Sequence, residues 1–396
     1  MNLVVVSHKV CWRIDGLSSY ATDGGFPLQM KYLSQLFSST TLVVPCKGIA
    51  AVSGLTEITG NNISVEPLPT PTGHGLRRKV GFVRWLFINS PTIWRQVKQA
   101  DAVHAPIPGD VGTVGLVFAV LLRKRLFVRH CGNWLKPRTL AEHCWKLGME
   151  KLAGNRNAML ATGGGSIPPS LRNPKLEWIF STSITEEQLE SFSPRTSAPA
   201  TPRLVIACRQ EKEKGTDLVI RSLLRIRTRF PGVTLSVVGD GSQLPRLKAL
   251  ADEQRVGDSV VFHGKVTQSK VLDILCSSDL FCFPTSASEG FPKAVLEALA
   301  VGLPVVSTRV SVIPDLLSKG GGALIETLSP DELADTIIEI LSDPERYVAM
   351  SEKAIKTASS YTLETWRNQI ADFLKSSWKA EVAVAEMGKR QSVGRL

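Results

Sequence analysis

Short β-branched runs alternate with helical stretches along nearly the whole chain, and this alternation constrains the fold more than any other feature. In the first half, runs typical of strands lie at residues 3–6, 41–44, 63–66, 102–104, 126–129 and 158–161. Stretches with helical character separate them, at 26–37, 76–98, 111–123 and 138–152. Strands that alternate with helices are typical of parallel sheets. The sequence therefore predicts the α/β fold class.

The segment 193–202 has three prolines in ten residues and little to bury, so it is the best candidate linker. The alternation then begins again, with strands expected at 204–207, 234–238, 260–263, 280–283 and 305–308. Gly239-Asp240-Gly241 is either a fragment of a dinucleotide-binding loop or a plain tight turn. We predict two Rossmann-like domains that face each other across a cleft, since open α/β sheets bind ligands beyond the carboxyl ends of their strands. The predicted bounds are 1–195, 196–360, a helix over 361–380 and a flexible tail over 381–396.

Charge is unevenly distributed along the chain, whose net charge is +11. The first 200 residues hold 22 Lys and Arg against 12 Asp and Glu, and the remainder is almost neutral. This asymmetry indicates an anionic partner for the first half, which charge alone leaves open between a lipid phosphate, a membrane surface and nucleic acid. Basic residues around Trp85, Phe87 and Trp94 fit either a helix on an anionic membrane or an ordinary domain helix with a basic solvent face. Nucleic acid is the weaker choice, because no binding module is recognisable.

Seven scattered cysteines lack metal-ligand spacing, so neither a disulfide framework nor a zinc site is expected, and a reducing cytoplasm fits. The longest apolar run, 111–122, is shorter than the roughly 20 residues that span a bilayer. No signal peptide is expected either, because the apolar start is only four residues long.

The most informative stretch runs from Ser288 to Val306 and joins a strand to a helix through a glycine turn. Pro292 suits the start of a helix, where free backbone N–H groups bind phosphate well. Glu289 is expected in the turn, and Glu297 two turns into the helix, about 12 Å away. Each carboxylate could hold one hydroxylated ring of a nucleotide sugar. The alternative is a solvated helix with ordinary glutamates.

A second stretch places Arg209 at the end of a strand and Lys214-Gly215 before a helix, which Thr216 or Asp217 is expected to cap. Two cations there could neutralise a diphosphate leaving group. The chain has no Asp-x-Asp motif to hold Mg²⁺, so no metal or other cofactor is expected. Alone, this stretch also fits a solvated charged turn.

The second half resembles family-four retaining glycosyltransferases of the GT-B fold. The resemblance is carried by Arg209, Lys214-Gly215, the Glu289–Glu297 motif and Ala-x-Gly-x-Pro-Val at 300–305. The match covers most of 203–310. The resemblance implies that Arg209 and Lys214 bind the donor diphosphate, that Glu289 contacts the transferred sugar and that Glu297 binds the ribose. It also implies donor contacts from the backbone of Gly290, Phe291 and Pro292, and a last helix that crosses back to the first domain.

The first half resembles the family more loosely. Gly24-Gly25 is similar to the family's Gly-Gly loop, although a plain turn fits the spacing equally well. His130 is similar to the histidine near the reacting sugar, but Arg129 and Cys131 depart from the family pattern. His104 matches an Asp-Val-Val-His element whose usual second histidine is Pro106 here. Both histidines could instead be structural.

The resemblance implies a retaining, metal-independent hexosyltransferase with catalytic Glu289, His130, Arg209 and Lys214. Its partners would be a nucleotide-diphosphate sugar and a glycan or lipid-linked acceptor, as in polysaccharide biosynthesis. A cytoplasmic enzyme at the inner membrane face fits these substrates. A nucleotide-sugar epimerase or a non-catalytic sugar-nucleotide-binding relative remains open.

Overall fold

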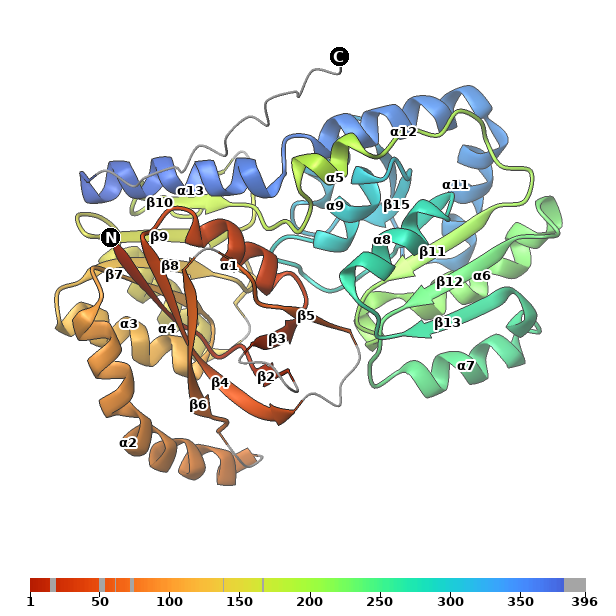
Figure 1. Ribbon diagram of the computed structural model, residues 1–396. Helices are drawn as coiled ribbons and strands as arrows, with labels where there is room; N and C mark the ends of the chain where they lie inside the picture. The colour runs from red at the N-terminus through yellow and green to blue at the C-terminus, as the bar shows by residue number, and fades with distance from the viewer. Residues whose placement is uncertain are drawn as a thin grey trace, which may run out of the picture.

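The computed structural model describes residues 1–14, 19–49, 54–60, 62–71, 75–137, 139–165 and 167–380. They form two halves that lie side by side, each built on its own sheet with helices packed on its faces (Figure 1). The predicted α/β class is confirmed. The predicted tail over 381–396 lies outside the described residues.

The first half contains a ten-stranded sheet in the order β10-β9-β8-β7-β1-β4-β2-β3-β5, with β6 also paired to β4. Its pairs are parallel except β2–β3 and β3–β5. The strands are β1 (Asn2–Val6), β2 (Cys11–Arg13), β3 (Tyr20–Asp23), β4 (Ser39–Ile49), β5 (Leu55–Glu57), β6 (Ile63–Pro69), β7 (Ala102–Ile107), β8 (Arg125–His130), β9 (Asn157–Thr162) and β10 (Leu176–Ile179).

The second half contains a six-stranded parallel sheet in the order β13-β12-β11-β14-β15-β16. The strands are β11 (Arg203–Ala207), β12 (Thr234–Val238), β13 (Val260–Gly264), β14 (Leu280–Phe283), β15 (Val305–Thr308) and β16 (Gly322–Ile325). Counted along the chain, this is the 3-2-1-4-5-6 order of a Rossmann fold. The order reverses between β11 and β14, so the loops after these strands flank the crevice in which such sheets bind ligands.

Helices cover both sheets. Those of the first half are α1 (Phe26–Ser34), α2 (Gly75–Gln99), α3 (Asp110–Leu121), α4 (Leu140–Leu152) and α5 (Glu186–Glu190). The others are α6 (Thr216–Arg229), α7 (Leu244–Glu253), α8 (Gln268–Cys276), α9 (Lys293–Ala300), α10 (Ile313–Leu317), α11 (Pro330–Ser342), α12 (Pro344–Ala358) and α13 (Leu363–Trp378), with 3-10 turns η1 (Lys212–Lys214) and η2 (Gly257–Ser259).

Local sequence sets several of these helix ends. Thr139 and Glu142 form a reciprocal capping box at α4, so this helix begins at Leu140 rather than at 138. Ser329 caps α11, whose first residue is Pro330. The prediction that Thr216 or Asp217 caps α6 is wrong. Its N-cap is Gly215, and the Thr216 hydroxyl instead donates to Gln210 Oε1 at 2.7 Å.

The last described helix, α13, lies across the first half beside α1 and β9 (Figure 1). Its buried face carries Trp366, Ile370 and Leu374. The Tyr32 hydroxyl donates to Glu364 Oε1 at 2.7 Å, and Arg367 donates to Gln35 Oε1 at 2.5 Å. A helix that follows the second half in sequence thus packs into the core of the first.

Two loops of the second half touch at Gly215. Its φ of 75° lies in the left-handed region, and an added Cβ would stand 2.1 Å from the Pro284 carbonyl oxygen. The loop after β11 therefore lies directly against the loop after β14. Gly239 is packed equally closely against the backbone, because an added Cβ there would stand 1.9 Å from the Cys208 carbonyl oxygen. Gly239-Asp240-Gly241 is therefore a tightly packed turn.

Replacement of Gly215 by Ala should destabilise the protein more than the same change at Gly264. Both have left-handed φ, which costs a side chain about 1–2 kcal/mol, but Gly264 has no neighbour within 4 Å. The clash with Pro284 should add about 1–3 kcal/mol for Gly215→Ala. Urea unfolding of both variants measures the difference, and equal losses would contradict the close contact.

Candidate functional site

Lys214 and Glu289 meet at the reversal point of the second sheet. Lys214 ends η1 and is only 8% exposed, and its ammonium donates to Glu289 Oε1. The contact between Gly215 and Pro284 holds the loop after β11, which carries Lys214, against the loop after β14, which carries Glu289. Arg209 leaves β11 in the same loop with an exposed side chain, and the described residues provide it with no ion pair. The structure thus joins two of the predicted residues directly and leaves the third, in the same loop as Lys214, exposed to solvent.

The loop after β14 leads into α9, which begins at Lys293 with Pro292 as N-cap. Glu297 is the fifth residue of α9 and so lies one turn into the helix. The prediction of two turns is wrong, because residues 289–292 are not helical. Phe291 is buried against Phe180 and Tyr361, with ring centroids 6.1 and 5.6 Å away. Since Phe291 is anchored, the turn at Gly290 is held in place.

Glu297 lies at the junction of the two halves. It is buried and accepts a hydrogen bond from the Ser183 hydroxyl of the first half. Burial raises the pKa of this carboxyl, while the Ser183 hydrogen bond and the charge of Lys293 oppose the rise. The alternative of a solvated surface glutamate is therefore wrong for Glu297. It does not line the cavity described next.

A cavity of about 240 Å³ lies between the two halves. The first half lines it with Lys9, Asp23, Gly24, Gly25, Phe26, Gln29, Arg129, Cys131, Thr162 and Ser181. The second half lines it with Glu289, Gly290, Phe291 and Lys293. The Gly24-Gly25 turn thus faces the loop before α9. An added Cβ on Gly25 would lie 3.1 Å from Lys293 Nζ, so the lack of a side chain lets the halves approach.

An ionic contact joins the two halves beside the cavity. Asp23 pairs with Lys9 of its own half and with Lys265 of the other, at 3.0 Å for Lys265. Burial acts to raise the pKa of Asp23, but hydrogen bonds from both lysines outweigh it and hold the pKa at about 2. The halves also pack closely at Gly290, where an added Cβ would stand 2.7 Å from the Gly132 carbonyl oxygen of the first half. The two halves are therefore in direct contact around the cavity.

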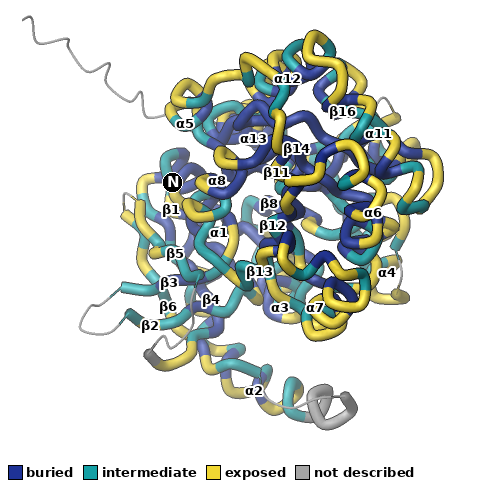
Figure 2. Tube along the Cα trace, turned by 90° about the vertical axis from the view of Figure 1, so that its right-hand side faces the viewer, coloured by how far each residue is buried: buried dark blue, intermediate teal, exposed yellow. Residues whose placement is uncertain are grey.

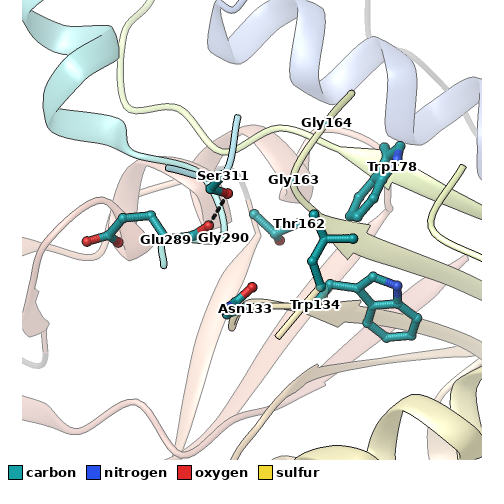
Figure 3. A pocket seen from close by; sticks show the side chains of 10 residues that line it. Asn133, Trp134, Thr162, Gly163, Gly164, Trp178, Glu289, Gly290 and Ser311 are labelled. Carbon is teal, nitrogen blue, oxygen red and sulfur yellow. Dashed lines mark hydrogen bonds between the residues drawn. The ribbon is translucent and has the colours of Figure 1, made fainter. Parts of the chain in front are cut away.

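A narrow pocket adjoins the cavity (Figure 3). Asn133, Trp134, Thr162 and Trp178 line it from the first half, opposite Gly290. The Ser311 hydroxyl donates to the Glu289 carbonyl oxygen, which fixes the loop. The Glu289 carboxylate points away from Trp134 and Trp178, and reaches Lys214 instead.

Both candidate histidines are buried. Nδ1 of His104 is 3.0 Å from the Phe127 carbonyl oxygen and its ring stacks on Phe127, which favours the structural alternative. His130 ends β8, and its ring meets Trp134 edge-on at 5.2 Å. It lies just behind Gly132, the residue that Gly290 contacts. Burial lowers the pKa of His130 to about 4 and that of His104 to about 3, so both rings are neutral near pH 7.

Sequence reasoning missed three cations of the cavity, Lys9, Arg129 and Lys293. Two carried a signal. Arg129 is a charged residue that directly follows the apolar run 126–128, and Lys293 follows Gly-Phe-Pro directly. The predicted basic helix α2 is present, but Trp85 faces inward and donates to Pro69 O at 2.5 Å. The side chains of residues 75–80 lie outside the described part of the chain.

Over the ranges that the structure describes, no three His, Cys, Asp or Glu side chains gather as metal ligands. Within the same ranges, every helix is too short or too polar to cross a bilayer.

Comparison with solved structures identifies the fold. The structure superposes on Anabaena Alr3699/HepE, solved in complex with UDP and glucose, with a TM-score of 0.66 and 17% identity, and the superposition covers 95% of this chain and 100% of that one. WaaG, a glycosyltransferase involved in lipopolysaccharide biosynthesis, gives a TM-score of 0.65 at 15% identity over 94% of this chain and 99% of that one. The fold is therefore GT-B, the two-domain fold of many glycosyltransferases.

Similarity to a known family lies in the second half, where residues 190–357 match the family model of glycosyl transferases group 1. A GDP-mannose-dependent alpha-(1-6)-phosphatidylinositol monomannoside mannosyltransferase of Mycobacterium tuberculosis is 30% identical over 182 residues, 44% of this chain and 47% of that protein. A D-inositol 3-phosphate glycosyltransferase of Corynebacterium urealyticum is 27% identical over 201 residues, 48% of this chain and 47% of its own length. The chain thus matches less than half of the length of these two relatives.

Acidification should weaken folding through the two buried histidines. Their folded pKa values lie below the ordinary value of about 6.5, so between pH 6.5 and 5 the unfolded chain takes up protons that the folded chain does not. Each histidine should lower the free energy of unfolding by about 1–2 kcal/mol over this range. Urea unfolding at several pH values checks this. His130→Asn should flatten the slope, the exposed His143→Asn should not, and identical slopes would contradict the prediction.

Proposed function

We propose that this protein is a family-four retaining glycosyltransferase that moves a hexose from a nucleoside diphosphate sugar to a glycan or lipid-linked acceptor. The observation that carries the proposal is the Lys214–Glu289 ion pair at the reversal point of the second sheet. The Lys214 ammonium can bind a diphosphate, and the Glu289 carboxylate can accept hydrogen bonds from sugar hydroxyls. The two groups are in contact beside the cavity between the halves, at the edge where such sheets bind ligands.

Each residue has a proposed task. Arg209 and Lys214 hold the diphosphate, and Glu289 accepts hydrogen bonds from hydroxyls of the transferred sugar. Backbone groups of Gly290, Phe291 and Pro292 approach the donor from the loop before α9, while Gly24 and Gly25 approach it from the other wall. His130 acts beside the reacting sugar as a neutral ring, and Glu297 binds the ribose. Because Glu297 accepts from Ser183 across the junction, its ribose contact requires that this hydrogen bond be exchanged.

The chemical step follows the same-face course that the resemblance implies. The bond between the anomeric carbon and the leaving phosphate oxygen breaks, and the acceptor oxygen bonds to the same face of that carbon. The leaving phosphate takes the acceptor's proton. Negative charge grows on the diphosphate during this step, so fixed cations next to it stabilise the transition state more than the ground state.

Metal independence belongs to the same proposal. Lys214 and Arg209 supply the positive charge that Mg²⁺ provides where carboxylates hold it. Lys214 is already buried at the site, where its ion pair with Glu289 has to give way to the diphosphate.

The acceptor side is proposed from the first half, which carries most of the net positive charge. Its helix α2 projects from the lower edge of the molecule (Figure 2). Phe87 is 78% exposed on this helix, and Ile88, Arg84 and Lys98 are exposed as well. Apolar and basic side chains on one exposed helix suit an anionic membrane surface. We therefore place the enzyme at the inner, cytoplasmic face of a membrane, with a lipid-linked acceptor and no nucleic acid partner.

Lys214→Ala should weaken binding of UDP or GDP about 10- to 100-fold and leave uridine or guanosine unchanged, because the lost contact is a hydrogen bond to a charged phosphate. Calorimetric titration of these four ligands measures it. Lys212→Ala is the matched control, an exposed lysine in the same 3-10 turn, and should bind all four normally. Equal losses for nucleoside and nucleotide would contradict the phosphate role.

Release of UDP or GDP from a panel of nucleotide sugars should persist in excess EDTA, since the leaving diphosphate is balanced by protein cations. A glucose and a mannose donor in each nucleotide series would also identify the base and sugar. Loss of the release with EDTA and its recovery with Mg²⁺ would remove the metal-free mechanism. Release of sugar isomers in place of transfer products would indicate an epimerase.

A further inference from the structure

Arg129 is the most unusual charged residue of the cavity. It lies in β8 and is only 4% exposed, yet it lines the cavity between the halves. Its Nη2 donates to Gln29 Oε1 at 2.9 Å, whereas Nε and Nη1 are buried without any hydrogen-bond partner. Its charge lies over the ring of Trp366, 5.1 Å from the centroid. The described residues contain no carboxylate in an ion pair with it.

Such a group is costly in a folded protein. A guanidinium keeps its proton under all ordinary conditions, so burial cannot make it neutral. A buried charge without a counter-charge, and with free N–H donors, opposes folding. The Gln29 amide cannot turn to serve it further, because its nitrogen already donates to Thr182 O and Ser181 Oγ at 3.0 Å each. The N–H groups on Nε and Nη1 of Arg129 are therefore left without an acceptor from the described residues.

Lys293 faces the same cavity from the other half. Burial lowers the pKa of its ammonium, and the charges of Arg129 and Lys9 act in the same direction, while Glu297 opposes them. Glu297 itself lies outside the cavity lining and accepts from Ser183. The two cations thus repel each other across the cavity, and none of the described cavity residues forms an ion pair with either.

The other charges of the cavity are already balanced. Asp23 is paired with Lys9 and Lys265, and Glu289 is paired with Lys214. An anion bound at the free cations therefore breaks no existing ion pair. Lys214 reaches Glu289 from the β11 loop of the second half, whereas Arg129 comes from β8 of the first half. The free cations lie on β8 and at the start of α9, whereas the proposed diphosphate contacts lie in the loop after β11.

We infer that Arg129 and Lys293 form a second anion subsite, which binds a carboxylate or phosphoryl group carried by a substrate sugar. The inference rests on the proposed function, since it concerns the substrates of that reaction. The acidic group can belong to the transferred sugar or to the acceptor sugar. Both sources present the same chemistry to a guanidinium and an ammonium.

The test compares acidic and neutral sugars on the full chain. In the donor arm, UDP-glucuronic acid is titrated against UDP-glucose and GDP-mannuronic acid against GDP-mannose. In the acceptor arm, glucuronic acid and mannose 6-phosphate are titrated against glucose and mannose in the presence of saturating UDP or GDP. The wild type should bind the acidic member more tightly in one arm, and that arm identifies the source.

Arg129→Gln should remove this preference, with acidic ligands bound about 10- to 100-fold more weakly, the loss expected for a hydrogen bond between charged groups. Lys293→Gln should act in the same direction. UDP and GDP alone should bind all variants within about twofold of wild type. Arg125→Gln, at the other end of the same strand, is the control and should keep the preference.

The melting temperature separates binding from folding. Arg129→Gln should melt at or above the wild-type temperature, because an uncompensated buried charge is removed. If it melts lower and Lys293→Gln retains the acidic preference, the subsite is refuted. Equal weakening of UDP and GDP would assign Arg129 to the diphosphate contacts and also refute it.

The two proposals fail differently. Normal UDP or GDP binding without any acidic preference would overturn this inference alone. A wild type that binds neither nucleotide nor nucleotide sugar would overturn the proposed function, and this inference with it.

Discussion

The contact between the loops after β11 and β14 is the constraint on which the site depends. Gly215 lies so close to Pro284 O that no side chain fits, and this approach brings the Lys214 ammonium to Glu289. Both loops leave the sheet where its strand order reverses, so the arrangement follows from the parallel topology. A side chain at Gly215 or a shifted loop would separate the cation from the carboxylate.

The second constraint is the junction between the halves. Three contacts join the halves: the ion pair of Asp23 with Lys265, the hydrogen bond from Ser183 to Glu297, and the close approach of Gly290 to the Gly132 backbone. Helix α13 adds a larger apolar contact, since Trp366 and its neighbours are buried against the first half. The cavity has walls from both halves, so its shape depends on these contacts as much as on either sheet.

Charge compensation distinguishes the parts of the cavity. Where lysine meets carboxylate, as at Lys214 and Asp23, the protein satisfies its own charges, and a ligand there has to compete with an existing pair. Where Arg129 and Lys293 face the same space, no such pair exists in the described residues. A buried cation without a counter-charge is unfavourable for folding, so the presence of Arg129 at the junction is better explained by binding than by stability.

The sequence by itself determined the α/β class and the longer strands and helices, because periodicity and glycine turns are local signals. That the β11 loop and the Glu289–Glu297 segment serve one site was implied only by the family resemblance. It missed short elements such as β2 and α5, which span too few residues to show a period. Only the tertiary structure decided that Glu297 is buried against Ser183 and that Arg129 is left unpaired beside Lys293. Those facts depend on which side chains two separate halves bring together, and no spacing along one chain specifies such a meeting.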